Sequence, residues 1–133
     1  MQRMLTVLMP VKNAQDTLIE SVVDVLDMAV DTERRFELLI IDDCSTDATN
    51  EVAVELASYY PQVRFVRHEM PLGYAESVRT GLRHCRGELV AVCEGRPPKF
   101  RMVERRLPAP VHAASRPAEP NFLRRVKSFA LGE

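Results

Sequence analysis

The sequence predicts an α/β fold in which helices cover both faces of a doubly wound, mainly parallel β-sheet. Apolar runs of strand length alternate along the chain with segments whose apolar residues recur at helical spacing. A polar turn follows each of these runs. Short right-handed connections between parallel strands place helices on both faces of a sheet, so the alternation indicates a doubly wound arrangement.

Four runs are expected to be strands, and all but the third are mainly apolar. A continuous apolar and β-branched run is typical of a strand that is buried on both faces. Pro10 closes the first run, and Pro61 precedes the third. The four runs are residues 5–9, 36–41, 63–66 and 89–93.

Three helices are expected between these strands. Asn13 is a candidate cap for the first helix, which is expected to end at about Val30. Ser45 or Asp47 is expected to cap the second helix, and Gly87 to end the third.

The chain is predicted to consist of one domain over residues 1–96 and a proline-rich basic tail over residues 97–133. Six of the nine prolines fall in the tail, and no further strand is expected there. Residues 1–95 carry 9 Lys and Arg against 16 Asp and Glu, whereas residues 96–133 carry 9 against 3. Residues 121–131 are expected to form a short amphipathic helix at the end of the tail.

Composition narrows the class of protein. With 133 residues, of which 46% are hydrophobic, the chain can bury a core, and its net charge of -1 excludes a strongly basic nucleic-acid binder. The three cysteines form no CxxC pair, and an odd count in a short chain does not describe a disulfide scaffold. The N-terminal apolar run is too short for a signal peptide, and no run approaches the ~20 residues of a membrane-spanning helix. We therefore expect a cytoplasmic protein.

Three polar clusters follow predicted strands. In an open parallel sheet, ligands bind beyond the carboxyl ends of the strands. Each cluster alone also fits a plain turn, because turns before helices need capping side chains for structural reasons. The clusters are Pro10-Val11-Lys12-Asn13, Asp42-Asp43-Cys44-Ser45-Thr46-Asp47 and Glu94-Gly95-Arg96.

The order and spacing of three motifs carry more information than any one cluster. Pro-Val-x-Asn ends the first strand, Ile-Ile-Asp-Asp-x-Ser-x-Asp-x-Thr ends the second, and Leu-Gly-Tyr-Ala-x-x-x-Arg-Thr-Gly-Leu opens the third helix. Together they resemble the family-two glycosyltransferases, in particular the members similar to dolichyl-phosphate-mannose synthase. The resemblance covers about residues 4–96. It implies the Rossmann-like nucleotide-diphospho-sugar transferase fold.

The resemblance implies a site for a UDP- or GDP-linked sugar. The backbone around Pro10 and Lys12 would line the nucleotide pocket, and Asp43 would accept a hydrogen bond from the base. An ionised carboxylate only accepts, which suits the ring N–H of uracil or guanine. Gly73 would let the backbone approach the ligand, or would serve as a turn glycine. The residues predicted to bind the nucleotide sugar are Pro10, Val11, Lys12, Asn13, Asp42, Asp43, Gly73 and Arg96.

The cluster after the fourth strand departs from the family pattern. An Asp-x-Asp motif there would hold Mg²⁺ or Mn²⁺, which neutralises the departing diphosphate. Glu94 can supply one metal ligand, but Arg96 places a fixed positive charge where the second carboxylate belongs. The sequence therefore predicts that the metal site is lost. Arg96, Lys99 or Arg101 is then a candidate to balance the diphosphate charge.

Two functions remain open from the sequence. The family's acceptor half, with its catalytic base, normally follows Asp-x-Asp, so no catalytic residue is identified. The three histidines, His68, His84 and His112, are expected at surface or helix-end positions. The chain is either a variant glycosyltransferase or an inactive relative that serves as a sensor or a homo-oligomeric assembly module. In the latter, the basic tail would dock on the acidic domain, in cis or in a homodimer. Contact of the basic helix with an anionic membrane is a third alternative.

Overall fold

A five-stranded sheet with the strand order β3-β2-β1-β4-β5 forms the centre of the molecule. The computed structural model describes residues 3–104. Strands β1 to β4 are parallel, and β5 runs antiparallel to β4 at one side of the sheet. The strands are β1 (Leu5–Val11), β2 (Phe36–Asp42), β3 (Val63–Arg67), β4 (Leu89–Glu94) and β5 (Lys99–Val103).

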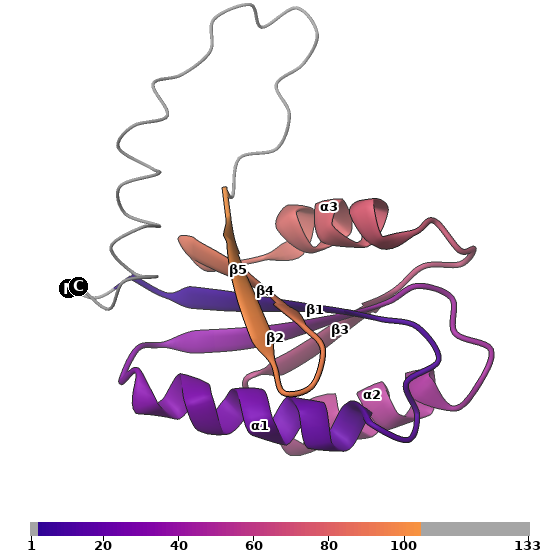
Figure 1. Cartoon of the computed structure of the whole chain (residues 1–133), viewed down its shortest axis with the longest axis horizontal. Helices are drawn as coiled ribbons and strands as arrows, with labels where there is room; N and C mark the ends of the chain where they lie inside the picture. Colours follow the sequence, from indigo (N-terminus) through magenta and orange to yellow (C-terminus); the bar gives the residue numbers. More distant parts are fainter. Residues whose placement is uncertain (1–2, 105–133) are drawn as a thin grey trace, which may run out of the picture.

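Three helices cover the two faces of this sheet. Helices α1 (Leu18–Asp31) and α2 (Thr49–Tyr59) lie on one face, and α3 (Tyr74–His84) lies on the other (Figure 1). The predicted α/β fold, with a doubly wound and mainly parallel sheet, is therefore confirmed. Within residues 3–104, no helix combines the length and the apolar character needed to cross a bilayer.

The hydrophobic core has one layer on each face of the sheet. Successive residues of a strand point to opposite faces. Ile40 accordingly packs in the layer beneath α1 and α2, whereas Ile41 packs in the layer beneath α3, and both are fully buried. Burial on both faces explains why the central parallel strands β1, β2 and β4 are mainly apolar.

Strand β5 corrects the expectation that no strand follows Arg96. Residues 99–102 alternate charged and apolar side chains, which is the period-two pattern of a strand. Pro97 and Pro98 lie in the turn between β4 and β5, where proline does not interrupt the ladder. The sheet therefore extends beyond the predicted boundary at residue 96. The rest of the predicted tail, including the expected helix over residues 121–131, lies outside the described residues.

The predicted helix caps are only partly correct. Helix α1 begins at Leu18 after Thr17, with no side-chain cap, so Asn13 does not cap it. Helix α3 ends at His84, three residues before Gly87. The N-cap residue of α2 is Ala48, but Asp47 just before it does bind the start of the helix, because its Oδ1 accepts a hydrogen bond from the backbone amide of Thr49 at 2.9 Å.

Candidate functional site

The carboxyl ends of β1 and β2 lie side by side. Pro10 is paired in register with Ile41, and Val11 with Asp42. The backbone amide of Asp43 also donates to the carbonyl of Val11 at 3.0 Å. The first two polar clusters thus meet at one end of the sheet, where ligands of open α/β sheets bind.

The loops that follow β1 and β2 are joined by reciprocal hydrogen bonds. The backbone amide of Asn13 donates to Ser45 Oγ at 2.8 Å, and the amide of Thr46 donates to Asn13 Oδ1 at 2.8 Å. Asn13 has a φ of 51°, in the left-handed region that asparagine tolerates better than most residues. Its side chain therefore fixes the neighbouring loop instead of capping α1.

The Asp-x-Ser-x-Asp-x-Thr motif continues this connection. Thr49 Oγ1 accepts the amide of Ala14 at 2.7 Å, and Asp47 Oδ2 accepts the amide of Gln15 at 3.2 Å. Gln15 Oε1 in turn accepts the amide of Ala48 at 2.8 Å. Hydrogen bonds, first of all that from the Thr49 hydroxyl, lower the pKa of Asp47. The side chains of this motif thus set the shape of the loops.

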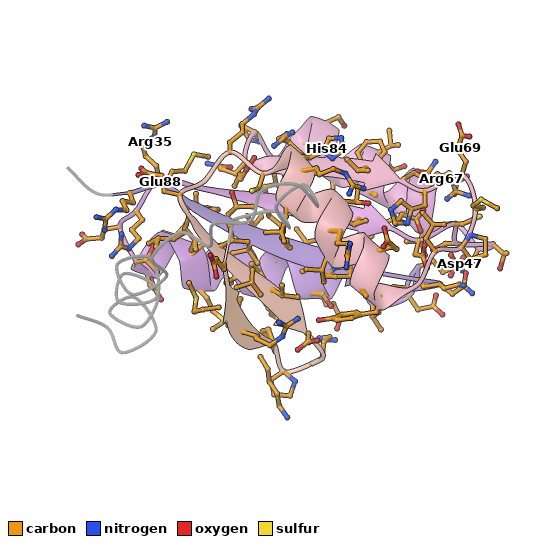
Figure 2. The ribbon with its side chains drawn as sticks, turned by 90° about the horizontal axis from the view of Figure 1, so that it is seen from above. Arg35, Asp47, Arg67, Glu69, His84 and Glu88 are labelled. Carbon is orange, nitrogen blue, oxygen red and sulfur yellow. The ribbon has the colours of Figure 1, made fainter. Side chains whose placement is uncertain are left out.

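Asp42 is fully buried and has its partners inside the protein. Its Oδ2 accepts from Arg67 Nη1 at 2.5 Å, and its Oδ1 accepts the backbone amide of Ser45 at 3.0 Å. A buried carboxylate needs such a partner, because desolvation of an unpaired charge is costly. Figure 2 shows Arg67 at the same end of the molecule as Asp47 and Glu69.

The carboxylate of Asp43 holds the loop before α3. Its Oδ1 accepts the amide of Leu72 at 2.8 Å, and its Oδ2 accepts the amide of Gly73 at 2.9 Å. Its Oδ1 also lies 2.8 Å from His68 Nδ1. Burial alone would raise the pKa of Asp43, but these hydrogen bonds outweigh burial and lower it.

His68 is a residue of this region that sequence reasoning missed. It was expected at the surface, but it is buried between Asp43 and Thr80, whose Oγ1 lies 2.7 Å from His68 Nε2. These partners are distant in the sequence, so no local signal revealed the burial. His84, by contrast, lies at the exposed end of α3 as expected.

Position 73 requires glycine because of its backbone conformation and not because of close packing. Its φ is 95°, which strains any other residue, and no atom lies within 4 Å of a Cβ placed there. The turn-glycine interpretation fits this geometry. Gly73 lies directly before α3, so its conformation sets the start of that helix.

The third cluster is split between the two faces of the sheet. Glu94 accepts a hydrogen bond from the hydroxyl of Tyr74 on α3, and Arg101 Nη2 donates to the same hydroxyl at 3.0 Å. Arg96 instead pairs with two acids of α1, Glu20 and, at 3.3 Å, Asp24. The predicted residues Glu94 and Arg96 therefore do not act on a common point.

The side chains near Glu94 do not fit a conventional metal site. Mg²⁺ and Mn²⁺ prefer several oxygen ligands, including more than one carboxylate or a carboxylate with phosphates. Among residues 3–104, no three His, Cys, Asp or Glu side chains converge closely enough to hold an ion. Glu94 itself is hydrogen-bonded to Tyr74, and the next acidic position of the motif is Arg96.

A mainly parallel sheet with helices on both faces, whose loops meet beyond β1 and β2, defines the class of open α/β proteins, in which ligands bind at this end of the sheet. Residues 6–95 match the family model described as glycosyl transferase family 2. The chain belongs to this family, which confirms the resemblance found in the sequence.

Relatives of known sequence are longer than this chain. An uncharacterized protein of Mycobacterium tuberculosis is 40% identical over 65 residues, which make up 48% of this chain and 19% of that protein. The putative glycosyltransferase EpsE of Bacillus subtilis is 29% identical over 91 residues, or 68% of this chain and 32% of EpsE. The chain thus spans a minor part of the length of these relatives.

Solved structures confirm the fold. The mannosyltransferase PcManGT from Pyrobaculum calidifontis, in complex with GDP-Man and Mn²⁺, aligns with a TM-score of 0.60 at 24% identity, over 72% of this chain and 30% of that one. S. aureus TarS 1–349, in complex with UDP-GlcNAc, aligns with a TM-score of 0.58 at 21% identity, over 66% of this chain and 25% of TarS.

Proposed function

We propose that this chain binds the nucleoside diphosphate of a UDP- or GDP-linked sugar and forms the donor-binding part of a glycosyltransferase. The observation that carries the proposal is the hydrogen bond between the Asp43 amide and the Val11 carbonyl, because it joins the turn after Pro10 to the acidic turn. Family membership supports the proposal, as do the nucleotide sugars named in the structures of PcManGT and TarS.

Within this site we assign the direct contacts to the backbone of Pro10, Val11, Lys12 and Asn13. The carboxylates of Asp42 and Asp43 already accept hydrogen bonds from Arg67, Leu72 and other groups of the protein. Asp42 and Asp43 therefore position the loops instead of reading the base. This differs from the role that the family resemblance implies for Asp43.

A ligand screen tests the proposal. Thermal shift and calorimetry with UDP, GDP and their sugars, with and without Mn²⁺, compare binding with that of ADP as the control. A ligand at about a hundred times its Kd stabilises the folded state by roughly 2.7 kcal/mol, which raises the melting temperature measurably. We expect a uridine or guanosine nucleotide to do so and ADP not to. The absence of a shift with every uridine and guanosine nucleotide would contradict the proposal.

Sugar transfer is a separate question from binding, because the Asp-x-Asp position reads Glu94-Gly95-Arg96. Donor hydrolysis or transfer above the level of a Glu94→Ala, Arg96→Ala double variant would establish a variant enzyme. Binding without turnover would favour the alternative function, an inactive sensor or assembly module.

One surface favours the assembly alternative. An apolar cavity of about 270 Å³ lies between α1 and β5, and Met28 and Phe100 on its border are exposed. Helix α1 carries four acids and no basic residue. We propose the basic, apolar segment 121–131 as the occupant, in cis or from a second copy. Deletion of residues 108–133 is expected to change the mass in solution or to reduce solubility, and an unchanged soluble monomer would contradict this role.

Location and membrane contact are proposed on separate grounds. Cys44, Cys85 and Cys93 are free thiols in the structure, which agrees with the proposed reducing cytoplasm.

Sedimentation with anionic vesicles tests peripheral contact through the basic tail, and deletion of residues 108–133 is expected to remove any such binding.

A further inference from the structure

Strand β5 brings Arg101 to the α3 face of the sheet. Phe100 and Met102 point to the opposite face, where they line the apolar cavity beside α1. Arg101 reaches the hydroxyl of Tyr74 at the start of α3, and its own position in β5 is opposite Val92 of β4. Arg101 and Glu94 thus meet at the same hydroxyl, at the end of β4 where the family resemblance implies the diphosphate.

Arg101, Tyr74 and Glu94 form a chain of hydrogen bonds. The Tyr74 hydroxyl donates its proton to Glu94 and accepts from Arg101 Nη2 at 3.0 Å. Burial and the hydrogen bond to Glu94 raise the pKa of Tyr74, and the nearby Arg101 opposes the shift only in part, so the phenol stays protonated. Glu94 therefore orients Tyr74, and Tyr74 in turn orients the guanidinium.

Arg96 in the β4–β5 turn and Arg101 in β5 differ in whether their charge is paired. Arg96 forms ion pairs with Glu20 and Asp24 of α1. Arg101 is exposed and, among the residues that the structure describes, forms no ion pair. A guanidinium has five N–H donors, and Arg101 uses one group for Tyr74, so a planar fork remains for an anion.

We propose that Arg101, positioned by Tyr74 and Glu94, binds the diphosphate of the nucleotide sugar and supplies the positive charge that a metal ion supplies elsewhere. The inference rests on the proposed function. An arginine fork binds phosphate oxygens bidentately, and it does not need the cluster of three or more metal ligands that residues 3–104 do not form. Lys99, two residues earlier in β5 and in register with Glu94, adds a second positive charge.

Calorimetry of the full chain in EDTA, with uridine, UMP and UDP or the guanosine series, tests the inference. We expect Arg101→Gln to weaken UDP or GDP binding roughly tenfold, the usual effect of losing a charge-assisted hydrogen bond, and to leave nucleoside binding unchanged. Tyr74→Phe is expected to weaken only the binding of the nucleoside diphosphate, and by less than Arg101→Gln does. Arg101→Lys is expected to keep part of the affinity that Arg101→Gln loses. Arg35→Gln is the matched control, because Arg35 lies at the end of the molecule opposite Asp47 and Arg67 (Figure 2).

The outcomes separate this inference from the proposed function. One outcome is that nucleosides and nucleotides both bind to the wild-type chain while Arg101→Gln weakens their binding equally, or leaves the binding of both unchanged. In either case the inference is wrong and the nucleotide site stands. Diphosphate binding that requires added Mn²⁺ would also overturn it. If neither base series binds to the wild-type chain, both the site and the inference are overturned. Melting curves of every variant confirm that a loss of affinity is not a loss of folding.

Discussion

The amide of Asp43 donates a hydrogen bond to the carbonyl of Val11 at 3.0 Å, across the carboxyl ends of β2 and β1. This bond continues the parallel ladder beyond Asp42 and brings two loops, each with its own motif, to one place. Asn13 and Ser45 then join the loops through reciprocal hydrogen bonds. The residues of the sequence motifs therefore act mainly by holding the loops of the proposed nucleotide site in shape.

Asn13→Ala is expected to destabilise the fold by about 2 kcal/mol. The change removes the acceptor of the Thr46 amide and places alanine at a φ of 51°. Asn13→Gly loses the same hydrogen bond but tolerates that φ, so it should be less destabilised than Asn13→Ala. Urea unfolding of the three proteins measures both differences. Equal stabilities of the glycine and alanine variants would contradict the role given to the backbone conformation.

Asp43→Asn is expected to lower the free energy of unfolding by about 2 kcal/mol or more. The NH₂ group of the asparagine would face a backbone N–H donor in a buried place. The substitution should also change the pH dependence of stability. The folded-state pKa of Asp43 is lowered from the unfolded value of about 3.9, so its contribution is present above that pH and is lost as the pH falls through the folded-state pKa.

Unfolding by urea between pH 2 and pH 7 measures this effect for wild type and Asp43→Asn. Glu37 also has a lowered pKa, despite its burial, because Thr6, the Arg86 amide and Arg64 hydrogen-bond to it, so only the difference between the two proteins reports on Asp43. Asp27→Asn, on the exposed side of α1, serves as the control. Parallel stability curves for wild type and Asp43→Asn below pH 4 would show that Asp43 is not the anchor described.

Gly87→Ala should destabilise the protein by about 3 kcal/mol, whereas Gly81→Ala should change its stability by less than about 1 kcal/mol. A Cβ at residue 87 would lie 2.6 Å from the backbone nitrogen of Thr6, which cannot move within the sheet. A Cβ at residue 81 meets only the flexible ends of Leu8 and Ile41, at 2.8 and 3.1 Å, and alanine favours the helix. Thermal unfolding of both variants checks the order, and its reversal would contradict this account of packing.

Cys44 is expected to react with a maleimide at pH 8 well before Cys93. Burial, with a smaller contribution from Glu94, raises the pKa of Cys93 to about 11, so its thiol stays protonated and covered. Cys44 is partly exposed in the acidic turn, next to Asp43. Bound nucleotide should slow its modification. Mass spectrometry of the labelled peptides measures the order, and equal labelling of Cys44 with and without nucleotide would count against binding at this turn.

The parallel part of the fold was predictable because its central strands β1, β2 and β4 are mainly apolar runs that are buried on both faces. Strand β5 was missed because the prolines before it were interpreted as the start of a tail. The period-two pattern of residues 99–102 was present, but a five-residue strand at the side of a sheet gives a weak signal.

The site was predictable in position and only partly in detail. Motif order placed the turns after β1 and β2 at one end of the sheet, and the register confirms it. The partners of His68 and the direction of Arg96 depend on contacts between residues far apart in the chain, namely Asp43 with His68 and Glu20 with Arg96. No local pattern encodes such contacts, so the burial of His68 and the ion pairs of Arg96 with α1 were not predicted from the sequence.

Amide chemical-shift mapping during titration with UDP or GDP tests the nucleotide site most directly. The account predicts that the largest shifts fall in residues 11–13 and 43–46 and at Gly73, while amides near Arg35 and Glu88 at the opposite end stay unchanged. Saturable shifts confined to that opposite end, or no shifts with either nucleotide, would contradict it.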